Sequence, residues 1–221
     1  MENLTEGNKP KQLEIGGMVF QAKIPAGEGP HPVFLMLHGW TGDENSMWIF
    51  SSRLPTATIQ LTPRGLFESP WGGYGWYPKL PQGWPKVDDF QPAINQIGQA
   101  LKPEYFPSAD LKSIRLVGFS QGAALAYSLA ITKPEKIKAV AGLSGFVPEG
   151  MEALVEEKPL DGKQIFVTHG TKDQLVPVEK ARQGIAILQR AGGIVSYCEE
   201  DVGHKLSASC FRNMQIFFQN N

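Results

Sequence analysis

The chain has 221 residues and a formal net charge of −1, with acidic and basic residues mixed along its length. This length fits one domain with a substantial hydrophobic core, so we expect a single domain over residues 1–221. The balanced charge argues against nucleic acid or an anionic membrane as the main partner. The sequence has no run of about 18 apolar residues, so we expect no membrane span.

The cysteines and the start of the chain bear on location. Cys198 and Cys210 have neither the spacing of metal ligands nor that of a disulfide framework. We therefore expect two reduced, buried and inert thiols in a cytoplasmic protein. Residues 1–10 are polar and lack the apolar segment of a secretory signal, which agrees with that location. We expect residues 1–11 to be poorly ordered.

The first part of the chain predicts a hairpin followed by buried strands. Gly16-Gly17 lies between two apolar runs, which is typical of an N-terminal β-hairpin. The continuous apolar run of residues 33–37 is typical of a strand buried on both faces. Residues 58–61 form a further run of this kind.

Residues 65–86 interrupt this pattern, because they are rich in glycine, proline and aromatic residues. A loop this long is usually functional or disordered, and the aromatic residues argue against disorder. The segment is either a surface loop packed by its own side chains or a wall of a substrate pocket, and both can hold. The sequence leaves open whether the segment moves as a lid. Its candidate substrate-binding residues are Trp71, Tyr74, Trp76 and Tyr77.

The rest of the chain alternates between helices and strands. Helical apolar spacing covers residues 90–101, 123–130, 178–191 and 207–218, and buried strands are predicted at 114–117, 139–143, 165–167 and 194–197. This alternation predicts an α/β fold with a mostly parallel central sheet and helices on both faces. No segment is long enough for a separate cap domain. Ligands of such sheets bind at the carboxyl ends of the strands.

Ser120 follows one of these strands and precedes a helix. It is the centre of Gly118-Phe119-Ser120-Gln121-Gly122, a Gly-x-Ser-x-Gly motif. A sharp strand-to-helix turn of this kind lifts the serine hydroxyl above the sheet, with glycines where side chains would collide. The alternative is a glycine-rich structural turn. The context favours Ser120 as a nucleophile.

A nucleophilic serine needs a base, and the chain has four histidines. His31 lies between two prolines and is interpreted as surface. His38 and His169 each precede a glycine at a strand end and are interpreted as structural. His204 follows the last strand and precedes the last helix, where a loop can reach across the sheet to Ser120. We therefore predict His204 as the base.

The base needs an acid to orient it. Asp173 lies just beyond the strand of residues 165–167, and the order Ser120, Asp173, His204 is the one used by serine hydrolases on this fold. The competing carboxylates lie close to the histidine in sequence: Glu199, Glu200 and Asp201. Because proximity along an extended chain does not direct a carboxylate at the imidazole, we predict Asp173 as the acid.

Acyl transfer also needs two donors for the oxyanion. The backbone amide of Gln121 directly follows the nucleophile and is one candidate. The loop after residues 33–37 supplies the other, and by position the amide of Trp40 is the best choice. The structural alternative is that this loop only turns the chain toward the next helix.

Five short blocks of the sequence occur in the order found in one enzyme family. They are Leu37-His38-Gly39…Gly42-Asp43, Pro63-Arg64-Gly65, Gly118-Phe119-Ser120-Gln121-Gly122-Ala123, His169-Gly170…Asp173…Val176-Pro177 and Gly203-His204. With these blocks, the chain from about residue 15 to its end resembles the phospholipase/carboxylesterase family of α/β-hydrolases.

The resemblance implies specific residues and an activity. It implies a triad of Ser120, Asp173 and His204, with the amides of Trp40 and Gln121 forming the oxyanion hole. The sequence departs from the family in two places. Trp40 stands where members often have a smaller residue, so the family does not fix the shape of the acyl pocket. The run of residues 71–84 has more aromatic residues than the family leads us to expect, so the substrate preferences of the family do not transfer directly.

We therefore expect a serine carboxylesterase that hydrolyses short- to medium-chain carboxylic esters through an acyl-enzyme, with no metal or organic cofactor. Trp40 is expected to contribute its side chain to substrate binding. Within enzymes, the alternatives are an acyl-protein or acyl-CoA thioesterase and a lysophospholipase. The alternative from another class is a non-catalytic binding protein with a hydrolase fold. The expected partner is a small-molecule ester or thioester, and the expected state is a monomer or homodimer.

Overall fold

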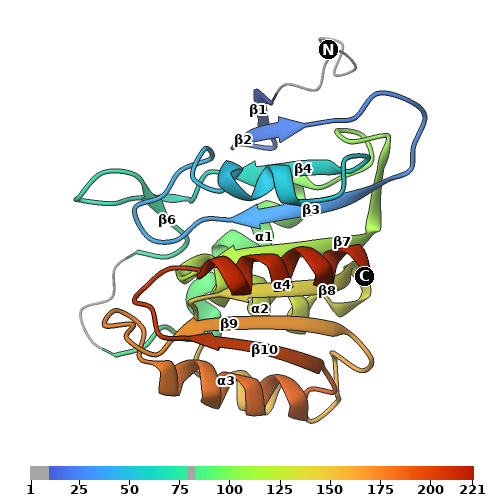
Figure 1. The fold of residues 1–221 in the computed structure, drawn as a ribbon. Coiled ribbons are helices and arrows are strands. Elements are labelled where there is room, and N and C mark those ends of the chain that lie inside the picture. Colours follow the sequence, from blue (N-terminus) through green and yellow to red (C-terminus); the bar gives the residue numbers. More distant parts are fainter. Residues whose placement is uncertain (1–9, 79–82) are drawn as a thin grey trace.

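The computed structural model of this chain describes residues 10–78 and 83–221. Its centre is an eight-stranded sheet with the strand order β1-β2-β4-β3-β7-β8-β9-β10 (Figure 1). The strands are β1 Lys11–Ile15, β2 Met18–Lys23, β3 His31–Leu37, β4 Ile59–Pro63, β7 Ala109–Phe119, β8 Ile137–Leu143, β9 Gln164–Gly170 and β10 Ile194–Glu200.

The sheet is mostly parallel. The strands from β4 to β10 in this order all run in one direction, whereas β2 pairs antiparallel with both β1 and β4. The parallel strands therefore all end at one edge, which is the left edge in Figure 1. The predicted hairpin at Gly16-Gly17 is confirmed, since β1 pairs with β2 across it.

Within residues 10–78 and 83–221, four α-helices and several single turns cover the two faces of the sheet. The helices are α1 Gln91–Ala100, α2 Gln121–Thr132, α3 Val178–Arg190 and α4 Ala208–Gln219, and the 3₁₀ turns include η1 Trp48–Arg53 and η2 Val87–Phe90. Side chains of α1, α2 and α3 pack with the strands in one apolar cluster. Side chains of η1 and α4 pack with them in the other, so the predicted two-faced arrangement is confirmed.

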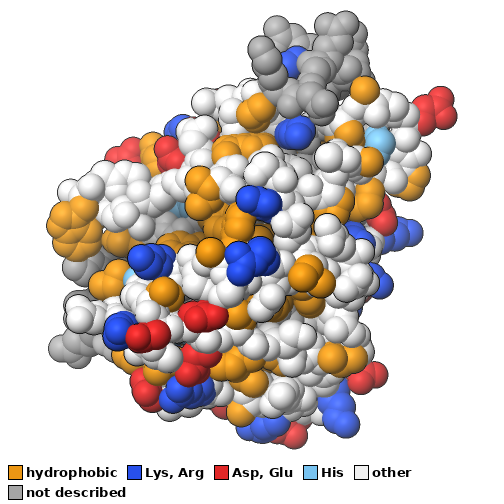
Figure 2. Space-filling model, viewed as in Figure 1, with side chains coloured by type: hydrophobic (Ala, Val, Ile, Leu, Met, Phe, Trp, Pro, Cys, Tyr) orange, Lys and Arg blue, Asp and Glu red, His pale blue; other side chains and the backbone are white. Residues whose placement is uncertain are grey.

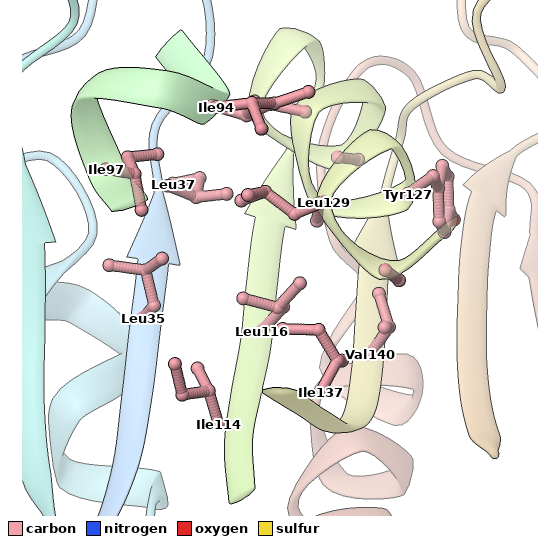
Figure 3. Close-up of a cluster of buried hydrophobic side chains, with 14 of the residues drawn as sticks. Leu35, Leu37, Ile94, Ile97, Ile114, Leu116, Tyr127, Leu129, Ile137 and Val140 are labelled. Atoms are coloured by element: carbon pink, nitrogen blue, oxygen red, sulfur yellow. The ribbon is translucent and has the colours of Figure 1, made fainter. Parts of the chain in front are cut away.

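The two apolar clusters follow from the alternation of side chains along each strand. In β3, Leu35 and Leu37 face α1 and α2, whereas Phe34 and Met36 face η1 and α4. Figure 3 shows the first of these clusters. Its labelled side chains are Leu35, Leu37, Ile94, Ile97, Ile114, Leu116, Tyr127, Leu129, Ile137 and Val140. Burial on both sides explains why β3 reads as a continuous apolar run.

The glycine- and aromatic-rich segment has some regular structure. Its short strands β5 Phe67–Glu68 and β6 Tyr74–Gly75 pair antiparallel, and Tyr74 also bridges to Gly42 in the loop after β3. Residues 79–82 of the segment lie outside the described residues. The same is true of residues 1–9, where we expected poor order, whereas Lys11 already belongs to β1.

The expectation of two reduced cysteines is wrong. Cys198 in β10 and Cys210 in α4 form a disulfide bond, with their Cα atoms 5.7 Å apart. The bond forms because α4 packs back against the strand that precedes it, a long-range contact that the spacing of two cysteines does not reveal. The predicted cytoplasmic location loses the support of reduced thiols. No helix of the described residues is long and apolar enough to cross a membrane.

Candidate active site

Ser120 occupies the turn between β7 and α2, at the edge where the parallel strands end. Its φ and ψ angles are 53° and −116°, a conformation that is unusual for a residue with a side chain. A Cβ on Gly122 would lie 2.1 Å from the carbonyl oxygen of Leu37, and one on Gly118 would lie 2.2 Å from that of Gly122. The two glycines thus permit the close packing of strand and helix that the turn requires, as the motif predicts.

The structure brings His204 and Asp173 together from two different loops. The Nδ1 of His204 lies 2.7 Å from Oδ2 of Asp173. The other carboxylate oxygen accepts hydrogen bonds of 2.9 Å from the amides of Leu175 and Val176. The carboxylate is fully buried and the imidazole is 16% exposed. Asp173 is therefore fixed in position, and it can orient the imidazole and stabilise its cation.

His204 also lies next to the turn that carries Ser120. The ring of Phe119, the residue before the serine, has its centroid 5.0 Å from that of His204. Among the described residues, the hydroxyl of Ser120 makes no hydrogen bond in this state. Hydrogen bonds between a serine and its general base are often long in structures without substrate. Ser120 is half-buried, and its hydroxyl is accessible.

The three competing carboxylates are engaged elsewhere. Glu199 pairs with Arg182 at 2.7 Å, and Asp201 pairs with Lys172 at 2.7 Å. Glu200 accepts a hydrogen bond from Ser209. None of the three contacts the imidazole of His204 in the part of the chain that the structure describes. Of the four candidate acids, Asp173 is the one with the required geometry.

The loop after β3 carries Trp40, whose amide is one of the two predicted oxyanion donors. It turns tightly, because the amide of Gly42 donates to the carbonyl of Gly39 and Thr41 adopts a φ of 67°. No partner is found for the amide of Trp40 within residues 10–78 and 83–221. The amide of Gln121 is the first in helix α2, where it has no intrahelical acceptor. Both predicted donors are thus available to a ligand.

An ion pair between the half-buried Arg64 and the buried Glu44 anchors this loop. Arg64 donates two hydrogen bonds of 2.7 Å to the carboxylate of Glu44, whose side chain is 4% exposed. The Arg64 guanidinium holds the pKa of Glu44 below its usual value. The guanidinium also lies over the ring of Tyr74, 4.8 Å from its centroid. These contacts tie the loop after β3 to the end of β4 and to the aromatic segment.

The structural interpretation of His38 is confirmed. Its Nε2 accepts from the amide of Gly65 at 2.9 Å, and its Nδ1 donates to the carbonyl of Gly39 at 2.7 Å. Burial lowers the pKa of His38, and the two hydrogen bonds suit a neutral ring. The carbonyl of His38 accepts from the indole N–H of Trp76. His38 thereby shapes the loop that carries Trp40.

His169 has a neighbour that its sequence position did not indicate. Its Nε2 lies 2.7 Å from the carbonyl of Val176, as expected of a structural histidine, and 3.3 Å from Oδ2 of Asp173. The buried Nδ1 has no partner within the described residues. The signal that could have found this contact is the four-residue spacing between His169 and Asp173 in a tight turn after β9.

The five candidate substrate-binding side chains lie in different environments. Trp76 is fully buried and donates to His38, so it offers no surface to a substrate and its predicted role as a wall is wrong. Trp71 is 64% exposed, whereas Tyr74, Tyr77 and Trp40 are half-buried. The rings of Trp40 and Tyr77 are 6.2 Å apart. Trp40 and Tyr77 therefore lie together, next to the predicted oxyanion donors.

One cluster of metal-ligand types is found among the described residues, and it is occupied by the disulfide. Cys198, Glu200 and Cys210 have ligand atoms within 4.8 Å of one another. Because the two sulfurs are bonded to each other, they offer no thiolate to a metal. The same disulfide closes the stretch of chain that carries His204, which the sequence analysis did not anticipate.

Comparisons with known proteins give a consistent result. A family model described as Phospholipase/Carboxylesterase matches residues 21–221. Acyl-protein thioesterase 1 of Kluyveromyces lactis is 27% identical over 167 residues, which cover 66% of this chain and 72% of that protein. A probable inactive carboxylesterase of Oryza sativa is 24% identical over 166 residues, covering 75% and 66%. The crystal structure of the Bacillus cereus carboxylesterase has a TM-score of 0.79 at 22% identity, covering 92% and 94%.

Proposed function

Since the chain belongs to the phospholipase/carboxylesterase family and has its α/β-hydrolase fold, we propose that it is a serine carboxylesterase. One observation carries this proposal. The hydrogen bond between His204 and the buried carboxylate of Asp173 lies beside the strained turn of Ser120. This arrangement supports Ser120 as nucleophile, His204 as base and Asp173 as acid, at the edge where ligands of parallel sheets bind.

In the proposed mechanism, the hydroxyl of Ser120 attacks the acyl carbon while Nε2 of His204 removes its proton. Asp173 holds the proton on Nδ1 and stabilises the imidazolium. The amides of Trp40 and Gln121 donate to the oxyanion. His204 then gives the proton to the leaving alcohol, and a water molecule deprotonated by the same imidazole releases the acid from Ser120. These reaction steps need neither a metal ion nor an organic cofactor.

The substrate is proposed to be a short- to medium-chain carboxylic ester. An acyl-protein or acyl-CoA thioester is the second candidate, favoured by the likeness to an acyl-protein thioesterase. A lysophospholipid is the third, because the same triad serves all three. Cytoplasmic location and a monomeric or homodimeric state stay predictions.

The alternative from another class is a binding protein without turnover, and one relative carries the name of a probable inactive carboxylesterase. A fluorophosphonate probe distinguishes the two, because it forms a stable bond only with an activated serine. We expect one label per chain on the native protein and none on Ser120→Ala. Failure of the native protein to react would reject the serine-hydrolase mechanism.

An assay with two substrates of one acyl group separates esterase from thioesterase. Butyryl esters of p-nitrophenol and butyryl thioesters of a small thiol present the same acyl chain to Ser120. The proposal expects a higher kcat/KM for the oxyester after correction for the intrinsic reactivity of each substrate. A higher corrected value for the thioester would favour the second candidate.

A further inference from the structure

A groove of about 510 Å³ opens beside the predicted oxyanion loop, between this loop, η1 and the start of α4. Its volume lies within the range of small-molecule sites, roughly 300–1,000 Å³. Its walls are mainly apolar and include Met47, Ile49, Phe50, Phe119, Leu206 and Phe211, together with the polar residues Thr41, Ser46 and Lys205. In Figure 2, hydrophobic side chains gather over the region between the short helix of residues 48–53 and α4, next to Lys and Arg side chains.

The groove lies on the histidine side of the site. Lys205 and Leu206, the two residues after His204, line it. Phe119 lines it as well, and the ring of Phe119 packs against that of His204. Gly39 and Trp40 form its border toward the predicted oxyanion hole. A molecule in the groove would therefore contact the surroundings of the base and of the oxyanion at once.

The position of His204 identifies the part of a substrate that enters the groove. In acyl transfer the imidazole must give its proton to the leaving oxygen or sulfur, so the leaving group has to depart next to the histidine. The acyl part extends from the reacting carbon in another direction. A leaving group that departs next to His204 would therefore lie beside the residues that line the groove.

Trp40 separates the groove from the aromatic segment. Trp40 is among the residues that line the groove, and its ring centroid lies 6.2 Å from that of Tyr77. A Cβ on Gly75 would lie 2.2 Å from the ring of Trp40, so the segment is packed tightly against it. The indole therefore has a fixed position between the groove and the aromatic segment.

We propose that the groove binds the leaving group of the substrate, and that this group is an extended apolar alcohol or thiol. This inference rests on the proposed function and adds the substrate part that the function left open. Ile49, which is 72% exposed, offers apolar surface that such a group would cover. Covering apolar surface is favourable in proportion to the area removed from water.

The inference is tested with two series of esters. In alkyl acetates from ethyl to octyl, the acyl group is constant and the leaving alcohol lengthens with little change in its acidity. We expect kcat/KM to rise about two- to fourfold per methylene until the groove is filled. In ethyl esters from acetate to octanoate, the leaving group is constant, and the series reports the acyl side alone.

Ile49→Asp places a carboxylate on the wall of the groove, at a side chain that is exposed and so adds little to folding. We expect it to lower the ratio of octyl to ethyl acetate in kcat/KM by at least about tenfold, because a charge there disfavours an apolar chain. The acyl series should keep its slope. Ile194→Asp is the matched control, since Ile194 is also exposed and lies at the amino end of β10, opposite the carboxyl ends of the parallel strands. The control should change neither series.

A second measurement does not require turnover of a long ester. 1-Octanol should inhibit hydrolysis of p-nitrophenyl acetate competitively, and Ile49→Asp should weaken this inhibition. If Ile49→Asp lowers the slope of the acyl series and leaves that of the alcohol series unchanged, the groove binds the acyl chain and the inference is overturned. Flat slopes in both series would overturn it as well, whereas absence of hydrolysis and of fluorophosphonate labelling would reject the proposed function itself.

Discussion

The turn that carries Ser120 and the loop that carries His204 reach the same edge of the sheet, but different contacts hold them. The turn is fixed by backbone packing, with Gly118 and Gly122 where a Cβ would meet carbonyl groups at about 2 Å. The loop is fixed by side chains from distant parts of the sequence. His204 binds Asp173, Asp201 binds Lys172, and a disulfide joins the two elements that flank the loop.

This difference decides how each region responds to substitution. The turn has one shape that avoids collision, so its geometry cannot be adjusted without moving β3 or α2. The contacts that hold the loop can be removed one at a time, and each removal should leave the sheet in place. The position of Ser120 is thus set by the backbone of the fold, whereas that of His204 is set by individual side-chain contacts.

The largest effect should come from the chemistry that the two regions share. Ser120→Ala and His204→Ala should each lower kcat by roughly 10⁴- to 10⁶-fold, and the double variant by little more, because members of a triad act as a unit. Steady-state kinetics on purified, folded variants measures this. If His204→Ala keeps more than about a tenth of the activity, the base is assigned wrongly.

Asp173→Asn should have the second-largest effect and lower kcat by roughly 10³- to 10⁴-fold, because the amide favours the wrong imidazole tautomer. Asp201→Asn is the matched control on the loop of His204. It removes an exposed ion pair with Lys172 and should change kcat by less than about tenfold. The reverse ranking of the two variants would overturn the choice of acid.

The disulfide should contribute mainly to stability. Closing a loop of twelve residues is worth about 3 kcal/mol through the unfolded state, so Cys198→Ala/Cys210→Ala should lower the free energy of unfolding by about that amount. Denaturant titrations measure it. A thiol reductant should produce the same loss in the native protein and none in the double variant. Equal stability of both proteins before and after reduction would show that the bond does not constrain the loop.

The smallest effect concerns pH and the loop on the nucleophile side. Burial lowers the pKa of His38 from 6.5, so below about pH 6.5 the unfolded chain binds a proton there that the folded protein does not. The free energy of unfolding should therefore fall as the pH drops through this range, by up to about 1.4 kcal/mol per unit. His38→Gln, which does not titrate, should show a smaller slope in urea titrations between about pH 5.5 and 7.5. Identical slopes would contradict this account.

The sequence predicted the parts of the molecule that depend on local pattern. The strand predicted from the continuous apolar run in β3 and the helix predicted from the apolar spacing in α1 are both present. A strand buried on both faces and a helix buried on one face leave different patterns of apolar residues. The turn at Ser120 was predictable for the same reason, since its two glycines are required by neighbouring backbone. The meeting of His204 with Asp173 followed from the order of loops at the strand ends.

What the sequence missed depends on how the helices pack back on the sheet and on the exact shape of a turn. The disulfide requires α4 to fold back on β10, and the contact of His169 with Asp173 requires the tight turn after β9. Trp76 was expected in the wall of a substrate pocket because the sequence of a loop does not show which of its aromatic side chains face the solvent and which face the core. The groove between η1 and α4 is lined by residues from four separate segments, which no spacing connects.

The buried indole of Trp76 has a consequence for engineering this protein. Its side chain donates to the carbonyl of His38, and its backbone amide donates to the side chain of Gln121, each at 2.7 Å. It therefore joins the chain on both sides of the predicted oxyanion hole. A library that varies the exposed Trp71 leaves both contacts in place. One that varies Trp76 removes the indole hydrogen bond to His38 and should disturb the loop of the predicted donor Trp40. Diversity introduced into the aromatic segment is therefore productive only where the segment faces outward.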